Sequence, residues 1–283
     1  MKIRISTDSA ADLSKELIEK YDIAVMPFSV TLGDETRYDG VDLTGAELLE
    51  FVDRTDELPK TAAPSDNAYQ EHFAKMLEAC DKVIHFSISN ELSMSCSNAI
   101  KASKEFDGKV AVIDTRSLST GIALPALYAC DLIKEEKTFE EIVEKCTEVV
   151  PHIQASFTLD SLKLLHKGGR CSGTTKLLAM ALSIKPSMQM KDGKLGAYRK
   201  YMMKKFEVVV KKYVLDTLAE FNDYDTTRVF VTHTPTNSEV VNMVKEMVKD
   251  KFDEVIECEA GATISSHCGK NTIGILYINK KRD

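Results

Sequence analysis

The first 150 residues of the chain alternate short apolar runs, rich in β-branched residues, with segments that have the apolar spacing of a helix. The apolar runs include residues 2–6 (KIRIS), 23–32 (IAVMPFSVTL), 82–88 (KVIHFSI) and 109–115 (KVAVIDT), and a helical pattern follows each of them. Strands that alternate with helices in this way pair in parallel and place the connecting helices on the faces of the sheet. The alternation therefore predicts an α/β domain over residues 1–150, with a mainly parallel sheet and helices on both faces.

The second half of the chain, which begins near Pro151, has a different pattern. Residues 188–198 (MQMKDGKLGAY) predict a β-hairpin that turns at Asp192-Gly193, because Asp-Gly pairs favour two-residue hairpin turns. A long helix is predicted from Lys204 to Phe221, and the strand–helix repeats are fewer than in the first half. We therefore predict a smaller mixed α+β domain over residues 151–283.

Charge and cysteine content argue against several classes of function. The 37 basic and 44 acidic residues give a formal charge of −7 without a long Lys/Arg block, so no nucleic-acid groove is expected. The seven cysteines are scattered and odd in number, and the six histidines form no close pair, which argues against a disulfide framework or a metal site. No signal peptide and no run of roughly 20 apolar residues is present. We expect a cytoplasmic, monomeric protein that carries no metal or cofactor.

Small polar residues gather where the predicted strands end. The most crowded stretch is SISNELSMSCSN (87–98), and the others are STDS (6–9), DTRSLSTG (114–121) and TAAPS (61–65). The carboxyl ends of parallel strands face a common crevice in which ligands bind, so these four segments are expected to line one rim. Each segment alone is also explained by helix capping and turns, and Ser65 in particular is predicted to cap the helix that follows it.

The serine-rich stretch raises the question of a catalytic serine. A nucleophile elbow would read Gly-x-Ser-x-Gly, and LSMSC has neither glycine. A triad of Ser93, His85 or His267, and Asp114 is conceivable, but a chain with this many serines and six histidines offers such a set by chance. The sequence therefore supplies hydrogen-bond donors without a convincing catalytic set.

Eight sequence blocks in fixed order carry a family resemblance. They are TDSAADL (7–13), YDGVDLT (38–44), PKTAAPS (59–65), SISNELSMSCSNA (87–99), VIDTRSLSTG (112–121), FTLDSLKLLHKGGR (157–170), KPSMQMKDGKL (185–195) and SSHCGKNTIGI (265–275). Along nearly its whole length the chain resembles the DegV family of bacterial fatty-acid-binding proteins. The resemblance implies one long-chain fatty acid, such as palmitate, bound between the two domains.

The same resemblance implies which residues hold the fatty acid. It places Thr61 and Ser93 on the carboxylate, His267 near the head group, and Arg170 in the surrounding polar network. Ser65 and the backbone N–H of Met94 are supporting candidates. An ionised carboxylate has about four acceptor sites and no donor, so hydroxyl and N–H groups suit it without any catalytic base.

Three functions remain open at this point. The first is a non-enzymatic carrier that holds a fatty acid and, as the resemblance implies for some members, presents it to a separate dihydroxyacetone-kinase-like fatty acid kinase. The second is a serine-dependent lipid or ester hydrolase, or an acyltransferase, that acts through Ser93. The third is a partner-binding module in which lipid is only structural. Transient contact with a membrane surface is compatible with the first.

Overall fold

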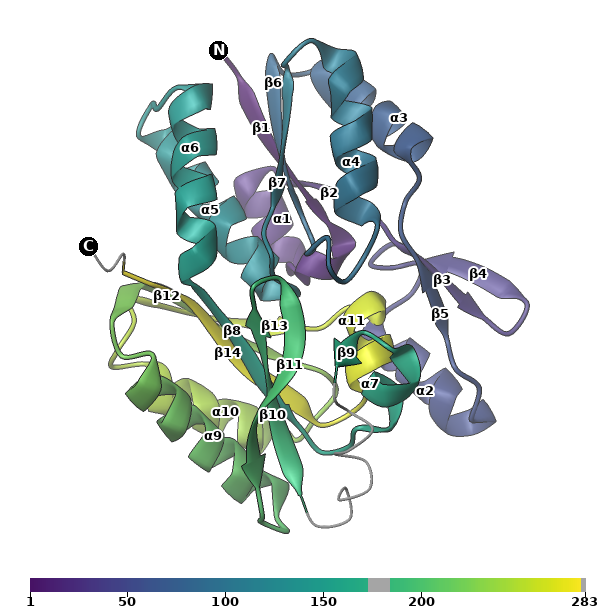
Figure 1. Ribbon diagram of the computed structural model, residues 1–283, viewed down its shortest axis with the longest axis vertical. Helices are drawn as coiled ribbons and strands as arrows, with labels where there is room; N and C mark the ends of the chain where they lie inside the picture. Colours follow the sequence, from purple (N-terminus) through teal and green to yellow (C-terminus); the bar gives the residue numbers. More distant parts are fainter. Residues whose placement is uncertain (173–183, 281–283) are drawn as a thin grey trace.

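The computed structural model describes residues 1–172 and 184–280, and Figure 1 shows two halves stacked along the long axis of the molecule. The upper half contains a four-stranded sheet with the strand order β2-β1-β6-β7, in which every pair is parallel. Its strands are β1 (Ile3–Asp8), β2 (Ala24–Met26), β6 (Lys82–Ser87) and β7 (Val110–Asp114). The predicted parallel sheet is confirmed.

Helices cover both faces of this sheet, as predicted (Figure 1). One face packs against α3 (Asp66–Leu77) and α4 (Ser95–Ser103), and the other against α1 (Lys15–Tyr21), α5 (Thr120–Lys134) and α6 (Phe139–Val149). Neighbouring residues of β6 show this two-sided burial, because Val83 belongs to the first core and Ile84 to the second. Short 3-10 helices lie at Ser9–Ala11, Lys104–Phe106 and Val150–His152.

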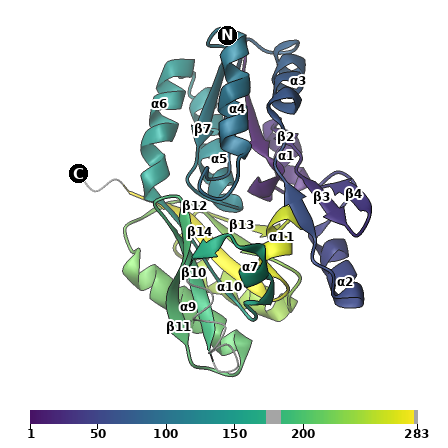
Figure 2. The same ribbon diagram turned by 45° about the vertical axis from the view of Figure 1, so that its right-hand side comes forward.

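A small antiparallel sheet in the first half departs from the prediction. The run 23–32 is not one strand: Pro27 separates β2 from β3 (Ser29–Leu32), which pairs with β4 (Glu35–Tyr38) and β5 (Lys60–Ala62). Proline has no N–H for a sheet ladder, and the next N–H, that of Phe28, donates to Ser9 Oγ instead. This sheet and α2 (Gly45–Thr55) pack beside α7 (Lys163–Gly168) and α11 (Ala262–Cys268), as Figure 2 shows.

The second half is built on a seven-stranded mixed sheet with the order β13-β12-β14-β8-β10-β11-β9. Its strands are β8 (Ile153–Leu159), β9 (Cys171–Ser172), β10 (Lys185–Lys191), β11 (Lys194–Tyr201), β12 (Tyr224–His233), β13 (Glu254–Glu259) and β14 (Thr272–Asn279). The predicted hairpin is confirmed as β10–β11, and Asp192 and Gly193 have the positive φ values that its tight turn requires. The predicted long helix is α9 (Phe206–Glu220), which covers one face of the sheet together with α10 (Ser238–Val248).

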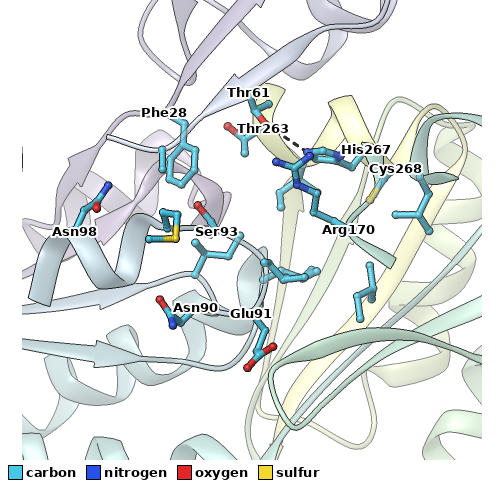
Figure 3. Close-up of a pocket in the computed structure, with 18 residues that line it drawn as sticks. Phe28, Thr61, Asn90, Glu91, Ser93, Asn98, Arg170, Thr263, His267 and Cys268 are labelled. Atoms are coloured by element: carbon cyan, nitrogen blue, oxygen red, sulfur yellow. Dashed lines mark hydrogen bonds between the residues drawn. The ribbon is translucent and has the colours of Figure 1, made fainter. Parts of the chain in front are cut away.

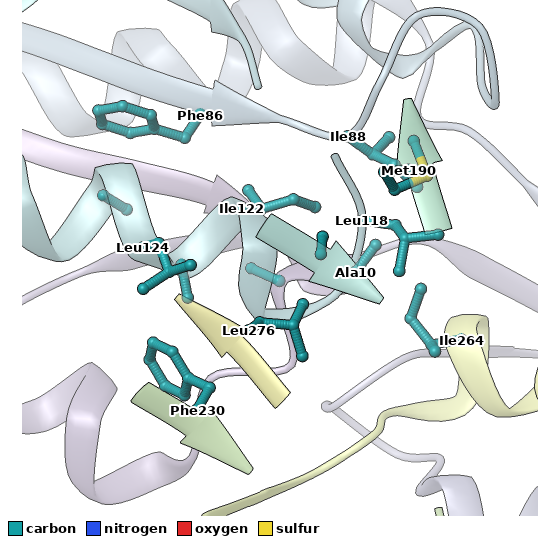
Figure 4. Close-up of a cluster of buried hydrophobic side chains, with 14 of the residues drawn as sticks. Ala10, Phe86, Ile88, Leu118, Ile122, Leu124, Met190, Phe230, Ile264 and Leu276 are labelled. Carbon is teal, nitrogen blue, oxygen red and sulfur yellow. The ribbon is translucent and has the colours of Figure 1, made fainter. Parts of the chain in front are cut away.

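The other face of the large sheet packs against the upper half and shares its core. Figure 4 shows Phe86 and Ile122 of the upper half in the same buried cluster as Phe230 and Leu276 of the lower half. Side chains from both sides of residue 150 pack in this one cluster, so the division into domains 1–150 and 151–283 remains our proposal. The shared interior also means that any cavity here is bounded by both halves.

Candidate functional site

The site is a cavity of about 480 Å³ between the two halves (Figure 3). It is bounded by β5, the turn between β6 and α4, the end of α7, and one side of α11. Its lining residues are Phe28, Thr61, Ala63, Ile88, Asn90, Glu91, Leu92, Ser93, Met94, Asn98, Leu118, Leu165, Arg170, Leu195, Thr263, Ile264, His267 and Cys268. Five of the six predicted site residues therefore line one cavity: Thr61, Ser93, Met94, Arg170 and His267.

A second, smaller cavity of about 30 Å³ lies beside the first, against the large sheet. The two cavities share Leu118, Ile264 and Cys268, and the smaller one extends to Phe157 and Leu276 of the large sheet. Polar side chains lie around part of the larger cavity, and the apolar side chains that both cavities share define an apolar path toward the large sheet.

The serine-rich turn contributes one serine to the cavity lining. Ser87 and Ser95 donate hydrogen bonds to the buried Asp8 carboxylate, and Ser89 donates to the Gly193 carbonyl oxygen at 2.6 Å. Ser93 is half-buried, lines the cavity, and accepts a hydrogen bond from the Ser95 N–H at 3.2 Å. Three of the four segments expected to line one rim contribute residues to the cavity, and residues 6–9 do not; several of the hydroxyl groups in these segments bond elsewhere instead.

Asp8 organises the base of this turn. Its carboxylate also accepts the Ile88 N–H at 2.9 Å and the Tyr69 hydroxyl, and His85 Nε2 lies 3.3 Å away. Burial alone would raise the pKa of Asp8, but the hydrogen bond and charge of His85, with the Tyr69 hydroxyl, lower it below its ordinary value. The buried charge ties the end of β6 to the start of α4, and so fixes the backbone on either side of Ser93.

His267 and Thr61 meet at the other side of the cavity. His267 Nε2 lies 3.4 Å from Thr61 Oγ1, the contact drawn in Figure 3. Burial, followed by the nearby Arg170 charge, lowers the pKa of His267 to about 4, so the ring is neutral at pH 7. Its Nδ1 is buried without a hydrogen-bond partner among the described residues. This atom packs against Gly168, where only a glycine leaves room for it. The neutral ring is therefore available to a ligand as a hydrogen-bond donor.

Arg170 and Met94 border the cavity where it meets the surface. Arg170 is exposed and donates from Nη1 to the Gly168 carbonyl oxygen at 2.7 Å, just beyond Gly169, whose positive φ ends α7. Met94 is 63% exposed and precedes α4. Ser65 lies outside the lining: it caps α3 as predicted, and its Oγ accepts the Ala68 N–H at 3.2 Å.

The sequence did not reveal Thr263 as a lining residue. Its side chain is only 4% exposed, and Oγ1 has no partner within the described part of the chain. Thr263 lies one helical turn before His267, and residues four apart share a helix face. That spacing was the available signal, but a seven-residue helix is too short to show a clear apolar period.

The structure does not bring together the residues of the conceivable Ser-His-Asp triad. No histidine in the described residues hydrogen-bonds to Ser93 Oγ; His85 instead contacts Ser6 and Asp8, and Asp114 accepts the Arg116 N–H. Within residues 1–172 and 184–280, no three His, Cys, Asp or Glu side chains group closely enough to hold a metal ion. The same residues include no helix of the length and apolarity needed to cross a bilayer.

Comparison with known proteins gives a consistent family. A family model described as an uncharacterised protein of the DegV family matches residues 2–280. A DegV domain-containing protein of Clostridium perfringens is 31% identical over 280 residues, which is 99% of each chain. A DegV family protein from Thermus thermophilus, described as fatty-acid-binding, has a TM-score of 0.88 at 26% identity and covers 99% of this chain and 100% of its own. A DegV lipid-binding protein from Thermotoga maritima has a TM-score of 0.87 at 26% identity and full coverage of both chains.

Proposed function

The chain belongs to the DegV family, and from that premise we propose that it binds a single long-chain fatty acid in the cavity between its two halves. The Thermus thermophilus and Thermotoga maritima relatives, described as binding fatty acid or lipid, support this ligand class. The observation that carries the proposal is the shape of the cavity. Hydroxyl, imidazole and guanidinium groups gather around part of the larger cavity, and apolar side chains supply much of its remaining lining.

The polar part of the cavity suits a carboxylate. Thr61 and Ser93 each supply a hydroxyl donor, the Met94 N–H adds a backbone donor, and neutral His267 adds a ring N–H. The protein as a whole has a net charge of −7, and Arg170 supplies a positive charge at the cavity that favours binding of an anion there. Each hydrogen bond to a charged head group contributes about 1.5–3 kcal/mol.

The apolar path suits the acyl chain. Leu118, Ile264 and Cys268 line both cavities, so a chain that starts at the head-group site is directed toward Phe157 and Leu276. Burial of each methylene contributes about 0.8 kcal/mol, so about ten methylenes give roughly 8 kcal/mol before the entropic cost of binding. The tail therefore supplies most of the affinity, and the head group sets its orientation.

We also propose that the protein presents the carboxylate to a fatty acid kinase of the dihydroxyacetone-kinase-like type. Arg170 and Met94 are exposed beside the polar part of the cavity, which supports a head group close to the surface. Incubation of oleate-loaded protein with such a kinase and ATP would give acyl phosphate. Loss of kinase co-purification on Met94→Ala, which removes a 63% exposed side chain and keeps the backbone N–H, with retained oleate binding would separate docking from lipid binding.

Native mass spectrometry of the purified protein tests fatty-acid binding. We expect an added mass that matches a long-chain acid, and displacement of that mass by excess oleate. Thr61→Val and Ser93→Ala should each weaken oleate binding, whereas the matched control Ser103→Ala, at the far end of α4, should not. Protein that is ligand-free and ignores both oleate and palmitate would refute the proposal.

The geometry gives the hydrolase alternative no added support, because no base among residues 1–172 and 184–280 is hydrogen-bonded to Ser93 Oγ. A panel of acyl esters still tests it directly. Turnover that is present in the wild type and absent in Ser93→Ala would establish catalysis, and absence of turnover in both would leave the carrier function.

A further inference from the structure

The start of α11, in the lower half, is held by two buried carboxylates of the upper half. Asp39 Oδ1 accepts the Ala262 N–H at 2.6 Å and Oδ2 accepts the Thr263 N–H at 3.2 Å. Asp12 Oδ1 accepts the Gly261 N–H at 2.8 Å. These three N–H groups are the donors that the beginning of a helix leaves without helical partners. Side chains more than 200 positions away in the sequence therefore cap the helix.

The two carboxyl groups are close to each other and nearly inaccessible to water. Asp39 is 1% exposed and Asp12 is 6% exposed. A Cβ placed on Gly261 would lie 2.7 Å from Asp39 Oδ1 and 3.3 Å from Asp12 Oδ1, so both carboxyl groups border the same point. Ser9 Oγ donates to Asp39 at 3.0 Å, and a 2.5 Å hydrogen bond joins Ser119 Oγ to Asp12.

The helix held in this way carries two of the polar groups of the cavity. Asp39 fixes the position of Thr263 directly, because the Thr263 N–H donates to its carboxylate. His267 lies one helical turn later (Figure 3). We propose that Asp39 and Asp12 form a clamp between the halves that positions Thr263 and His267 toward the ligand head group. This inference rests on the proposed fatty-acid function, and both aspartates act as positioning residues that do not touch the ligand.

The two carboxyl groups of the clamp differ in protonation. Burial, and then the neighbouring Asp39 charge, raise the pKa of Asp12 well above its ordinary value, so Asp12 is the member that holds a proton. Asp39 accepts three hydrogen bonds from N–H and hydroxyl donors. The other titratable groups that act on Asp12 are the thiols of Cys258 and Cys268, and burial raises the pKa of each to about 12, so both stay neutral.

The first test compares Asp39→Asn with Asp34→Asn, an exposed carboxylate in the neighbouring hairpin turn. Affinities for oleate and for oleyl alcohol are measured on delipidated protein, because the alcohol has the same tail without the carboxylate. We expect Asp39→Asn to weaken oleate binding about tenfold or more while oleyl alcohol binding changes by less than about twofold. A structural defect without a positioning role would weaken both ligands alike.

The second test uses Asp12→Asn, since asparagine reproduces the protonated acid and also tolerates the positive φ of this position. In the wild type, ionisation of Asp12 beside Asp39 as the pH rises should lower the affinity for oleate relative to that for oleyl alcohol. In Asp12→Asn we expect near wild-type affinity at low pH and no such fall. This variant keeps the test decisive if Asp39→Asn does not fold.

The outcomes separate the two proposals. Wild-type protein that binds neither oleate nor oleyl alcohol refutes the fatty-acid function itself. Wild-type protein that binds oleate, with the same oleate-to-alcohol preference in Asp39→Asn and Asp34→Asn, refutes the clamp alone. An Asp12→Asn variant with the same pH dependence as the wild type likewise overturns the assigned proton.

Discussion

Gly168, the last residue of α7, gives the sharpest test of the role of His267. A Cβ on this residue would lie 2.2 Å from His267 Nδ1 and 3.0 Å from Cε1. Non-bonded carbon contacts are normally about 3.5–4.0 Å, so Gly168→Ala forces the imidazole to retreat by roughly 1 Å or more. The contact between His267 Nε2 and Thr61 Oγ1 is already 3.4 Å long, so we expect this movement to change it first.

The expected effect on binding follows from the loss of one head-group hydrogen bond. Such a bond to a charged group contributes about 1.5–3 kcal/mol, which corresponds to a loss of oleate affinity of roughly 10- to 150-fold. Oleyl alcohol should bind almost as well as before, because the apolar path is unchanged. The φ of Gly168 is not in the left-handed region, so the added methyl group introduces no backbone strain.

Fluorescent fatty-acid displacement measures both affinities, with Gly196→Ala as the matched control. A Cβ on Gly196, next to the lining residue Leu195, would meet no atom within 4 Å. We expect the control to bind oleate like the wild type. If Gly168→Ala also bound oleate with unchanged affinity, His267 would not contact the head group, and its placement in the site would be refuted.

Three further predictions concern stability and chain length. Asp8→Asn removes one oxygen acceptor of the Ser87, Ser95, Tyr69 and Ile88 hydrogen bonds and should lower the free energy of unfolding in urea by about 1–3 kcal/mol. Burial lowers the pKa of His72 from its ordinary 6.5 to about 4, so the stability that the neutral ring contributes is fully present above pH 6.5 and is lost as the pH falls toward 4. In urea unfolding, the free energy of unfolding of His72→Gln should therefore fall less than that of the wild type between about pH 7 and about pH 4.5. Leu118→Phe narrows the connection between the cavities and should weaken palmitate more than decanoate, by about 0.8 kcal/mol for each methylene excluded, in the displacement assay. Equal losses for the two acids would place the tail elsewhere.

Local sequence signals predicted most of the elements but not their assignment to sheets. The turn at Asp192-Gly193 and the parallel strands of the first half follow from residue types that act over a few positions. The small antiparallel sheet depends on Pro27, which ends one strand, and on the pairing of β3 with β5, about thirty residues further along the chain. Apolar spacing alone could not distinguish that pairing from continuation of a single strand.

The site divides in the same way. Spacing and composition yielded hydroxyl-rich loops without a function, and the positions of Thr61, Ser93 and His267 came from the family resemblance. The clamp of Asp12 and Asp39 could not be predicted, because each carboxylate meets the helix that it holds only across the boundary between the halves. Long-range contacts of this kind leave no periodic trace in the sequence.

Two polar atoms that line the cavity are buried without a hydrogen-bond partner in the described residues, whereas several hydroxyl groups of the serine-rich segments are paired. Ser87, Ser95 and Ser119 lie in segments as hydroxyl-rich as any in the chain, yet each is bonded to a buried aspartate. Buried polar groups are nearly always hydrogen-bonded, because an unmet donor or acceptor costs about 1–3 kcal/mol. Thr263 Oγ1 and His267 Nδ1 are the cavity-lining atoms of the described residues that break this rule. Both belong to the helix that the proposed clamp holds, so under the proposed function the clamp positions the two unpaired polar groups of the cavity.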